Sequence, residues 1–81
     1  MRIKPLKKIL QKILSKHSLI NKFRKQKGLF ENDPSHPSLN TELLRPKNLR
    51  IYSFRIDRKW RAIFIIVNHE VEIIDINPHY H

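Results

Sequence analysis

Residues 49–76, LRIYSFRIDRKWRAIFIIVNHEVEIIDI, decide the fold of this 81-residue chain. They contain three runs rich in isoleucine, valine and aromatic side chains, at positions 49–56, 59–67 and 70–76. Such runs are typical of β-strands. Asp57-Arg58 and Asn68-His69 lie between the runs, and connections this short join neighbouring antiparallel strands. The sequence therefore predicts a three-stranded antiparallel meander.

Two amphipathic helices are predicted ahead of the meander. In residues 5–17, PLKKILQKILSKH, apolar residues recur at three- and four-residue steps with lysines between them, and Pro5 suits the first turn of a helix. Ser18 is predicted to cap a second helix, in which Gly28 is the weak point. The two apolar stripes are Leu6, Ile9, Leu10, Ile13 and Leu14, then Leu19, Ile20, Phe23 and Leu29 or Phe30.

The segment between the helices and the meander is predicted to be a loop. Residues 31–48, ENDPSHPSLNTELLRPKN, hold three of the five prolines among polar side chains. The whole pattern predicts a single α+β domain over residues 1–81, with a helical hairpin packed on one face of a small antiparallel sheet. The other face of the sheet is then free to bind a partner.

The charge distribution predicts a polyanionic partner. The formal net charge is +10, and ten lysines or arginines precede Glu31 without one acidic residue. Nucleic acid or the ribosome is the expected partner, with an anionic membrane as the weaker alternative, because the apolar stripe of the first helix is needed to cover the sheet. The residues predicted to contact phosphate are Lys7, Lys8, Lys12, Lys16, Lys22, Arg24, Lys25 and Arg55.

Composition also excludes several classes of chemistry. The chain has no cysteine, which removes disulfides, thiolate catalysis and zinc–thiolate sites, and no apolar run long enough for a signal peptide or a membrane span. A cytoplasmic protein without a membrane role is expected. His79 and His81 stand two residues apart without a carboxylate at a fixed offset, so the sequence favours no metal or other cofactor. Tyr52, Phe54 and Trp60 could stack on bases, but packing in the core is the favoured interpretation.

Glu42, Arg61 and His79 are the candidate catalytic residues. Arg61 interrupts an apolar run, and a buried guanidinium there must be paired or must wait for an anion. A carboxylate, a fixed cation and an imidazole can together cleave RNA through its own 2′-hydroxyl, by removing a proton, stabilising charge on the phosphate and protonating the leaving oxygen. A simple salt bridge is the alternative interpretation of the same residues.

The segments NDPSHPSLNTELL, residues 32–44, and IYSFRIDRKWRAIFIIVNHEVEIIDINPHY, residues 51–80, resemble the RelE/ParE superfamily of toxins from type II toxin–antitoxin pairs. The ending His79-Tyr80 is most similar to YoeB-type mRNA interferases. The resemblance implies an endoribonuclease with Glu42 as general base, Arg61 as phosphate stabiliser, His79 as general acid and Tyr80 orienting the substrate. Relatives begin with a β-strand, so a fourth short N-terminal strand in residues 1–3 stays an open alternative.

The resemblance also implies binding partners and alternative functions. The expected partners are a cognate antitoxin, mRNA on the ribosome, and operator DNA reached only through the toxin–antitoxin complex. The alternative functions are a ParE-like toxin that binds DNA gyrase without catalysis, and an inactive basic binding module of the same fold.

One conflict stands within the predicted site. Strict alternation across the second turn places Arg61 on the face of Ile74, Ile76 and Tyr80 and puts His79 on the other face. Pro78 cannot donate to a strand ladder, so we expect it to end the strand and let His79 turn back toward Arg61.

Overall fold

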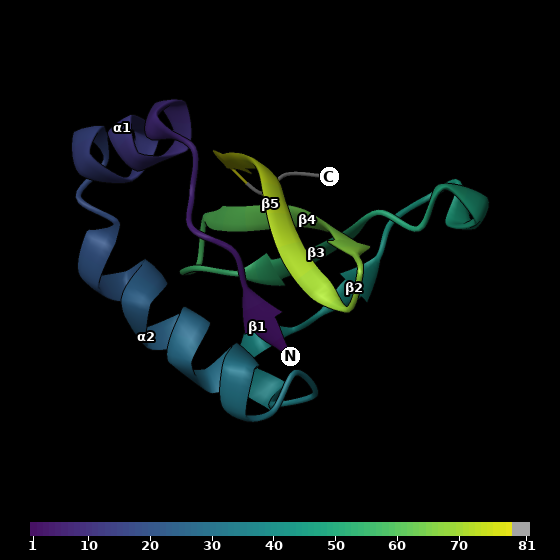
Figure 1. Ribbon diagram of the computed structural model, residues 1–81. Coiled ribbons are helices and arrows are strands. Elements are labelled where there is room, and N and C mark those ends of the chain that lie inside the picture. Colours follow the sequence, from purple (N-terminus) through teal and green to yellow (C-terminus); the bar gives the residue numbers. More distant parts are fainter. Residues whose placement is uncertain (79–81) are drawn as a thin grey trace.

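The computed structural model describes residues 1–78, which form a five-stranded sheet covered by two helices (Figure 1). The strand order across the sheet is β1-β5-β4-β3-β2. The helices are α1 (Lys8–Lys16) and α2 (Ile20–Asn32), and two short 3-10 helices span Pro37–Leu39 and Lys47–Leu49. The strands are β1 (Arg2–Ile3), β2 (Glu42–Leu43), β3 (Tyr52–Arg55), β4 (Trp60–Val67) and β5 (Glu70–Pro78).

The predicted meander is confirmed as β3, β4 and β5, joined by the two predicted turns. Asp57 fixes the first turn, because its Oδ1 accepts hydrogen bonds from the backbone N–H groups of Lys59 at 2.9 Å and Trp60 at 2.7 Å. Asn68 and His69 form the second turn with φ angles of 52° and 65°. Two successive positive φ angles match the right-handed twist of a hairpin.

The strands of the meander are antiparallel, as predicted, but the sheet as a whole is mixed, because β1 pairs in parallel with β5. The open alternative of a short N-terminal strand is thus realised. The Glu31 carboxylate holds this strand to the end of α2 by accepting the Ile3 N–H at 2.8 Å. The loop prediction also fails at β2, where Glu42 pairs with Ser53 of β3. Residues this polar form a strand here because an established edge strand offers them backbone partners.

A β-bulge corrects the predicted faces of β4 and β5. Ile63 pairs with Asp75 whereas Phe64 pairs with Ile73, so β5 carries one additional residue at this point. Beyond the bulge Arg61 lies opposite Asn77, not on the face of Ile76, which is buried in the core. The extra residue shifts the alternation by one position, which sequence alternation alone does not reveal.

Both helices pack on one face of the sheet, as predicted, and lie together on one side of it in Figure 1. Leu10 and Leu14 of α1 are buried there, but Ile9 was wrongly assigned to the stripe, since its side chain is 68% exposed. The core consists of Ile3, Leu10, Leu14, Leu19, Phe23, Phe30, Leu39, Phe54, Ile56, Ala62, Phe64, Val71, Ile73 and Ile76.

The helix boundaries differ from the predictions around two residues. Pro5 precedes α1 instead of opening it, and Ser18 does not cap α2 with its side chain. Ser18 adopts a φ of 56°, and its N–H donates to the carbonyl of Ser15 at 3.2 Å. It therefore closes α1 in a left-handed conformation and reverses the chain direction into α2.

The strand aromatics serve the core, as favoured from the sequence. Phe54 is fully buried, and its ring lies 5.2 Å from that of Phe30. Tyr52 stacks on Phe64 at 5.4 Å, and Trp60 contacts His17 at the end of α1 at 4.4 Å. This packing leaves the strand aromatics on the helix-covered face of the sheet.

Candidate active site

Arg61 is the centre of the sheet face opposite the helices. Its side chain is only 3% exposed. Nε donates a hydrogen bond to the Ser53 hydroxyl at 2.9 Å, and Nη2 donates to the carbonyl of Asn40 at 2.6 Å and of Ser53 at 3.3 Å. Neighbouring strand β3 and the loop before β2 thus fix the guanidinium plane, and a cation held in this way is preorganised for an anion.

The charge of Arg61 is only partly compensated. Burial lowers the pKa of the Arg61 guanidinium, the nearby Glu42 carboxylate raises it, and the Arg55 cation lowers it. Nη2 of Arg61 lies 3.8 Å from Oε2 of Glu42, whose side chain is 44% exposed. This distance is an ion pair without a hydrogen bond, so Glu42 keeps oxygen atoms available to a bound molecule.

Glu42 and Arg61 share one cavity of about 460 Å³, here called the open-face pocket. Its wall combines polar groups at the centre with aliphatic side chains at the edges. The lining residues are Glu42, Leu44, Ile51, Ser53, Arg61, Ile63, Ile74, Asp75, Asn77 and Pro78. None of the hydrogen bonds that Arg61 makes within residues 1–78 uses Nη1, which leaves this nitrogen for an incoming oxygen atom.

The remaining two predicted catalytic residues, His79 and Tyr80, lie outside the described residues, as does His81. The last described residue, Pro78, pairs with Trp60 at the beginning of β4, and Asn77 pairs with Arg61. The structure therefore follows the chain to the wall of the open-face pocket.

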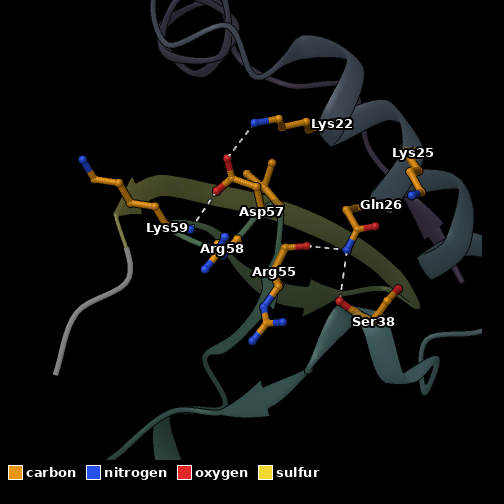
Figure 2. A pocket seen from close by; sticks show the side chains of 9 residues that line it. Lys22, Lys25, Gln26, Ser38, Arg55, Asp57, Arg58 and Lys59 are labelled. Atoms are coloured by element: carbon orange, nitrogen blue, oxygen red, sulfur yellow. Dashed lines mark hydrogen bonds and ion pairs between the residues drawn. The ribbon is translucent and has the colours of Figure 1, made fainter.

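The eight predicted phosphate contacts are exposed but do not form one surface. Lys7, Lys8, Lys12 and Lys16 belong to α1 and the residue before it, and Arg24 borders a groove between the helices. Lys22, Lys25 and Arg55 instead line a second cavity of about 510 Å³, here called the basic pocket (Figure 2).

Several residues of the two pockets were missed by sequence reasoning. Ser53 and Asn40 hold Arg61, and Arg58 and Lys59 extend the basic pocket. Ser53 carried a usable signal, since a hydroxyl inside an apolar strand next to a predicted buried arginine is an obvious partner. Asn40 acts through its backbone carbonyl, which no side-chain pattern can indicate.

Over residues 1–78, no group of three or more histidine, aspartate or glutamate side chains is placed to hold a metal ion. Neither helix in this part of the chain has the length and apolarity needed to cross a bilayer.

Several solved structures share this fold. YafQ from Escherichia coli strain BL21(DE3) superimposes with a TM-score of 0.72 at 12% identity, over 96% of this chain and 90% of YafQ. The YoeB–YefM complex from Staphylococcus aureus matches with a TM-score of 0.69 at 15% identity, over 99% of this chain and all of the matched chain. A heterotetrameric YoeB–YefM toxin–antitoxin complex from the same organism gives a TM-score of 0.66 at 17% identity. At these identities the three structures show a shared fold, which agrees with the α+β fold expected from the sequence.

The sequence comparisons are less informative. An uncharacterized protein of Haemophilus influenzae strain Rd is 40% identical over 45 residues, which is 56% of this chain. The match spans about 45% of that relative's length. No protein-family model matches the chain.

Proposed function

We propose that this chain is the toxin of a type II toxin–antitoxin pair and cleaves mRNA as a metal-independent endoribonuclease. The observation that carries the proposal is the Arg61 guanidinium, buried and fixed on the open sheet face, with the Glu42 carboxylate 3.8 Å away. The shared fold with YoeB and YafQ supports the toxin role.

Glu42 is the proposed general base. Its exposed carboxylate takes the proton from a ribose 2′-hydroxyl, and the 2′ oxygen then forms a bond to the adjacent phosphorus. Arg61 stabilises the additional negative charge on the phosphate oxygens, because its guanidinium is already oriented by Ser53 and Asn40. The bond from phosphorus to the 5′ oxygen breaks, which leaves a 2′,3′-cyclic phosphate and a 5′-hydroxyl end.

His79 is the proposed general acid that protonates the leaving 5′ oxygen, and Tyr80 is proposed to orient the substrate. The register of β5 supports this assignment. Asn77 lies opposite Arg61, and His79 and Tyr80 follow Asn77 and Pro78 directly in the chain. We propose that no metal or organic cofactor is needed, since Glu42 and His79 supply both proton transfers and Arg61 supplies the charge stabilisation.

The partners follow from the same proposal. A cognate antitoxin is supported by the YoeB–YefM complexes among the structures of the same fold. The mRNA is bound on the ribosome, operator DNA is contacted only through the toxin–antitoxin complex, and the location is cytoplasmic. The net charge of +10 suits a site of action made largely of RNA.

A translating extract tests the proposal. Purified protein is added to a bacterial translation extract, and the 5′ ends of a reporter mRNA are mapped, while the same sample is assayed for inhibition of gyrase supercoiling. New mRNA ends without gyrase inhibition are expected. Gyrase inhibition without new mRNA ends would contradict the ribonuclease proposal and indicate a toxin that binds gyrase. If the protein produced neither effect, the ribonuclease proposal would also be contradicted, and a binding module would be the remaining function.

A further inference from the structure

The basic pocket lies at the junction of the helical layer and the β3–β4 turn. Lys22 and Lys25 reach it from α2, whereas Arg55, Arg58 and Lys59 come from the end of β3 and the turn that follows (Figure 2). With Asp57 as its acid, the described lining carries five cations and one carboxylate, a net charge of +4. Cations gathered around one concavity repel one another, so the pocket favours an anionic occupant.

Hydrogen bonds hold the floor of this pocket rigid. Gln26 is only 6% exposed, and its Nε2 donates to the backbone carbonyl of Arg55 at 2.8 Å and of Ser38 at 3.2 Å. This amide joins α2, the 3-10 helix Pro37–Leu39 and β3 at one point. The backbone that carries Arg55 is therefore fixed, while the guanidinium stays exposed.

Asp57 fixes the turn at the rim of the basic pocket and neutralises part of the pocket's positive charge. One carboxylate oxygen accepts the N–H groups of Lys59 and Trp60, and the other lies 3.2 Å from Nζ of Lys22. Within residues 1–78 this is the one ion pair that a cation of the basic pocket makes. Lys25, Arg55, Arg58 and Lys59 thus remain available to an external anion.

Arg55, which lines the basic pocket, is the neighbour of Arg61 on the adjacent strand, although the two pockets share no described lining residue. Arg55 and Arg61 are direct cross-strand partners, so their side chains leave the same face of the sheet. Directly opposed residues have Cβ atoms about 5 Å apart. A phosphate held at Arg61 and the next one held at Arg55 would belong to a single extended strand.

We propose that the basic pocket is a second binding site for the sugar–phosphate backbone of the single-stranded RNA that enters the open-face pocket. The described residues of its lining include no aromatic ring, so it holds phosphates and reads no bases. The proposal deepens the proposed ribonuclease function and rests on it for the choice of RNA. Its consequence is a substrate that must extend beyond the scissile phosphate on the Arg55 side.

Binding of an uncleavable RNA tests this site separately from catalysis. The probe is a fluorescein-labelled hexanucleotide with 2′-O-methyl groups, which lacks the attacking hydroxyl, and fluorescence anisotropy is measured from 50 to 300 mM salt. The triple variant Lys25→Ala/Arg58→Ala/Lys59→Ala is expected to bind at least about tenfold more weakly. Its salt slope should fall by about 2, since each lost phosphate contact removes about 0.7.

A variant with the same charge change provides the control. Arg2→Ala/Arg45→Ala/Lys47→Ala removes three exposed cations that line neither pocket and are not among the predicted phosphate contacts, and it is expected to lose much less affinity. Asp57→Asn keeps an oxygen for the turn but removes the competing charge, so it is expected to bind more tightly. Equal losses in the two triple variants would overturn the proposal, as would unchanged binding by the pocket variant. Failure of the ribonuclease proposal would appear instead as absent cleavage with these binding results intact.

Discussion

Nη2 of Arg61 on β4 lies 3.8 Å from Oε2 of Glu42 on β2, although β3 runs between the two strands. Ser53 of β3 makes this approach possible, because its small side chain accepts from Nε of Arg61 and leaves room for the guanidinium above it. Glu42 in turn is paired with Ser53 in the sheet register. Three adjacent strands therefore place Glu42 and Arg61 in a single pocket.

Replacing Arg61 by lysine tests whether the fixed guanidinium matters beyond its charge. Arg61→Lys keeps the cation but loses the donors to Ser53 and Asn40, so cleavage is expected to fall by about 10²-fold or more. The free energy of unfolding should fall by about 1–3 kcal/mol, because buried acceptors lose their partners. Cleavage kinetics and urea denaturation measure the two effects. Arg45→Lys, an exposed position, is the control, and equal cleavage by both variants would contradict the assigned role.

Gln26 is expected to be a major polar contributor to stability. Gln26→Leu leaves the carbonyls of Arg55 and Ser38 without their buried donor, at a cost of about 1–3 kcal/mol in the free energy of unfolding. Gln11→Leu is the matched control, since Gln11 also donates to a backbone carbonyl but does so at the exposed surface. We expect that change to stay within about 0.5 kcal/mol. Similar urea midpoints for the two variants would show that the buried amide of Gln26 contributes no more to the free energy of unfolding than the exposed amide of Gln11.

Asp57 predicts a pH dependence of stability. Burial raises the pKa of Asp57, but hydrogen bonds from the N–H groups of Trp60 and Lys59 and the charge of Lys22 outweigh it and lower the pKa overall. A carboxylate whose pKa is lower in the folded state stabilises the fold above its unfolded pKa of about 3.9. This contribution disappears as the pH falls through the lower, folded pKa.

Thermal unfolding of Asp57→Asn from pH 2 to 7 checks this sign. The wild-type protein should be the more stable at pH 6, by no more than about 1 kcal/mol because the Lys22 side chain of the ion pair is 58% exposed to solvent. The difference should vanish toward pH 2. A difference that grows as the pH falls would reverse the assignment.

The β4–β5 turn offers a stabilising substitution. Asn68 and His69 both have positive φ angles, and a histidine at the second position is strained relative to glycine, which gives the preferred Asn-Gly turn. His69→Gly is expected to raise the free energy of unfolding by up to about 1 kcal/mol, after the entropy cost of glycine. Lys59→Gly, in the other turn but without a positive φ, should destabilise. A lower melting temperature for His69→Gly together with a higher one for Lys59→Gly would refute this interpretation of the turn.

The sequence predicted the meander and both helices well, because long apolar runs and regular three- and four-residue spacing are local signals. It left β1 as an open alternative and missed β2. Each of these strands contains two residues and pairs with one edge of the meander, β1 with β5 and β2 with β3. The candidate site was predicted in the same uneven way. Arg61 was conspicuous as a cation within an apolar strand, but its partner Asn40 acts through a backbone carbonyl. The bulge beside Ile63 reversed the expected face of Asn77 and Ile76, and one extra residue in a strand has no composition of its own.

The most direct test of the central claim is the single-turnover rate of mRNA cleavage by Glu42→Gln compared with Glu70→Gln. Glu42→Gln preserves shape and removes the proposed base, so the rate is expected to fall by about 10²–10⁴-fold. Its stability should be nearly unchanged, because the side chain is 44% exposed. Glu70 begins β5 at the far end of the strand from Asn77 and does not line the open-face pocket, so Glu70→Gln should cleave at the wild-type rate. A folded Glu42→Gln protein that cleaves as fast as Glu70→Gln would contradict the account.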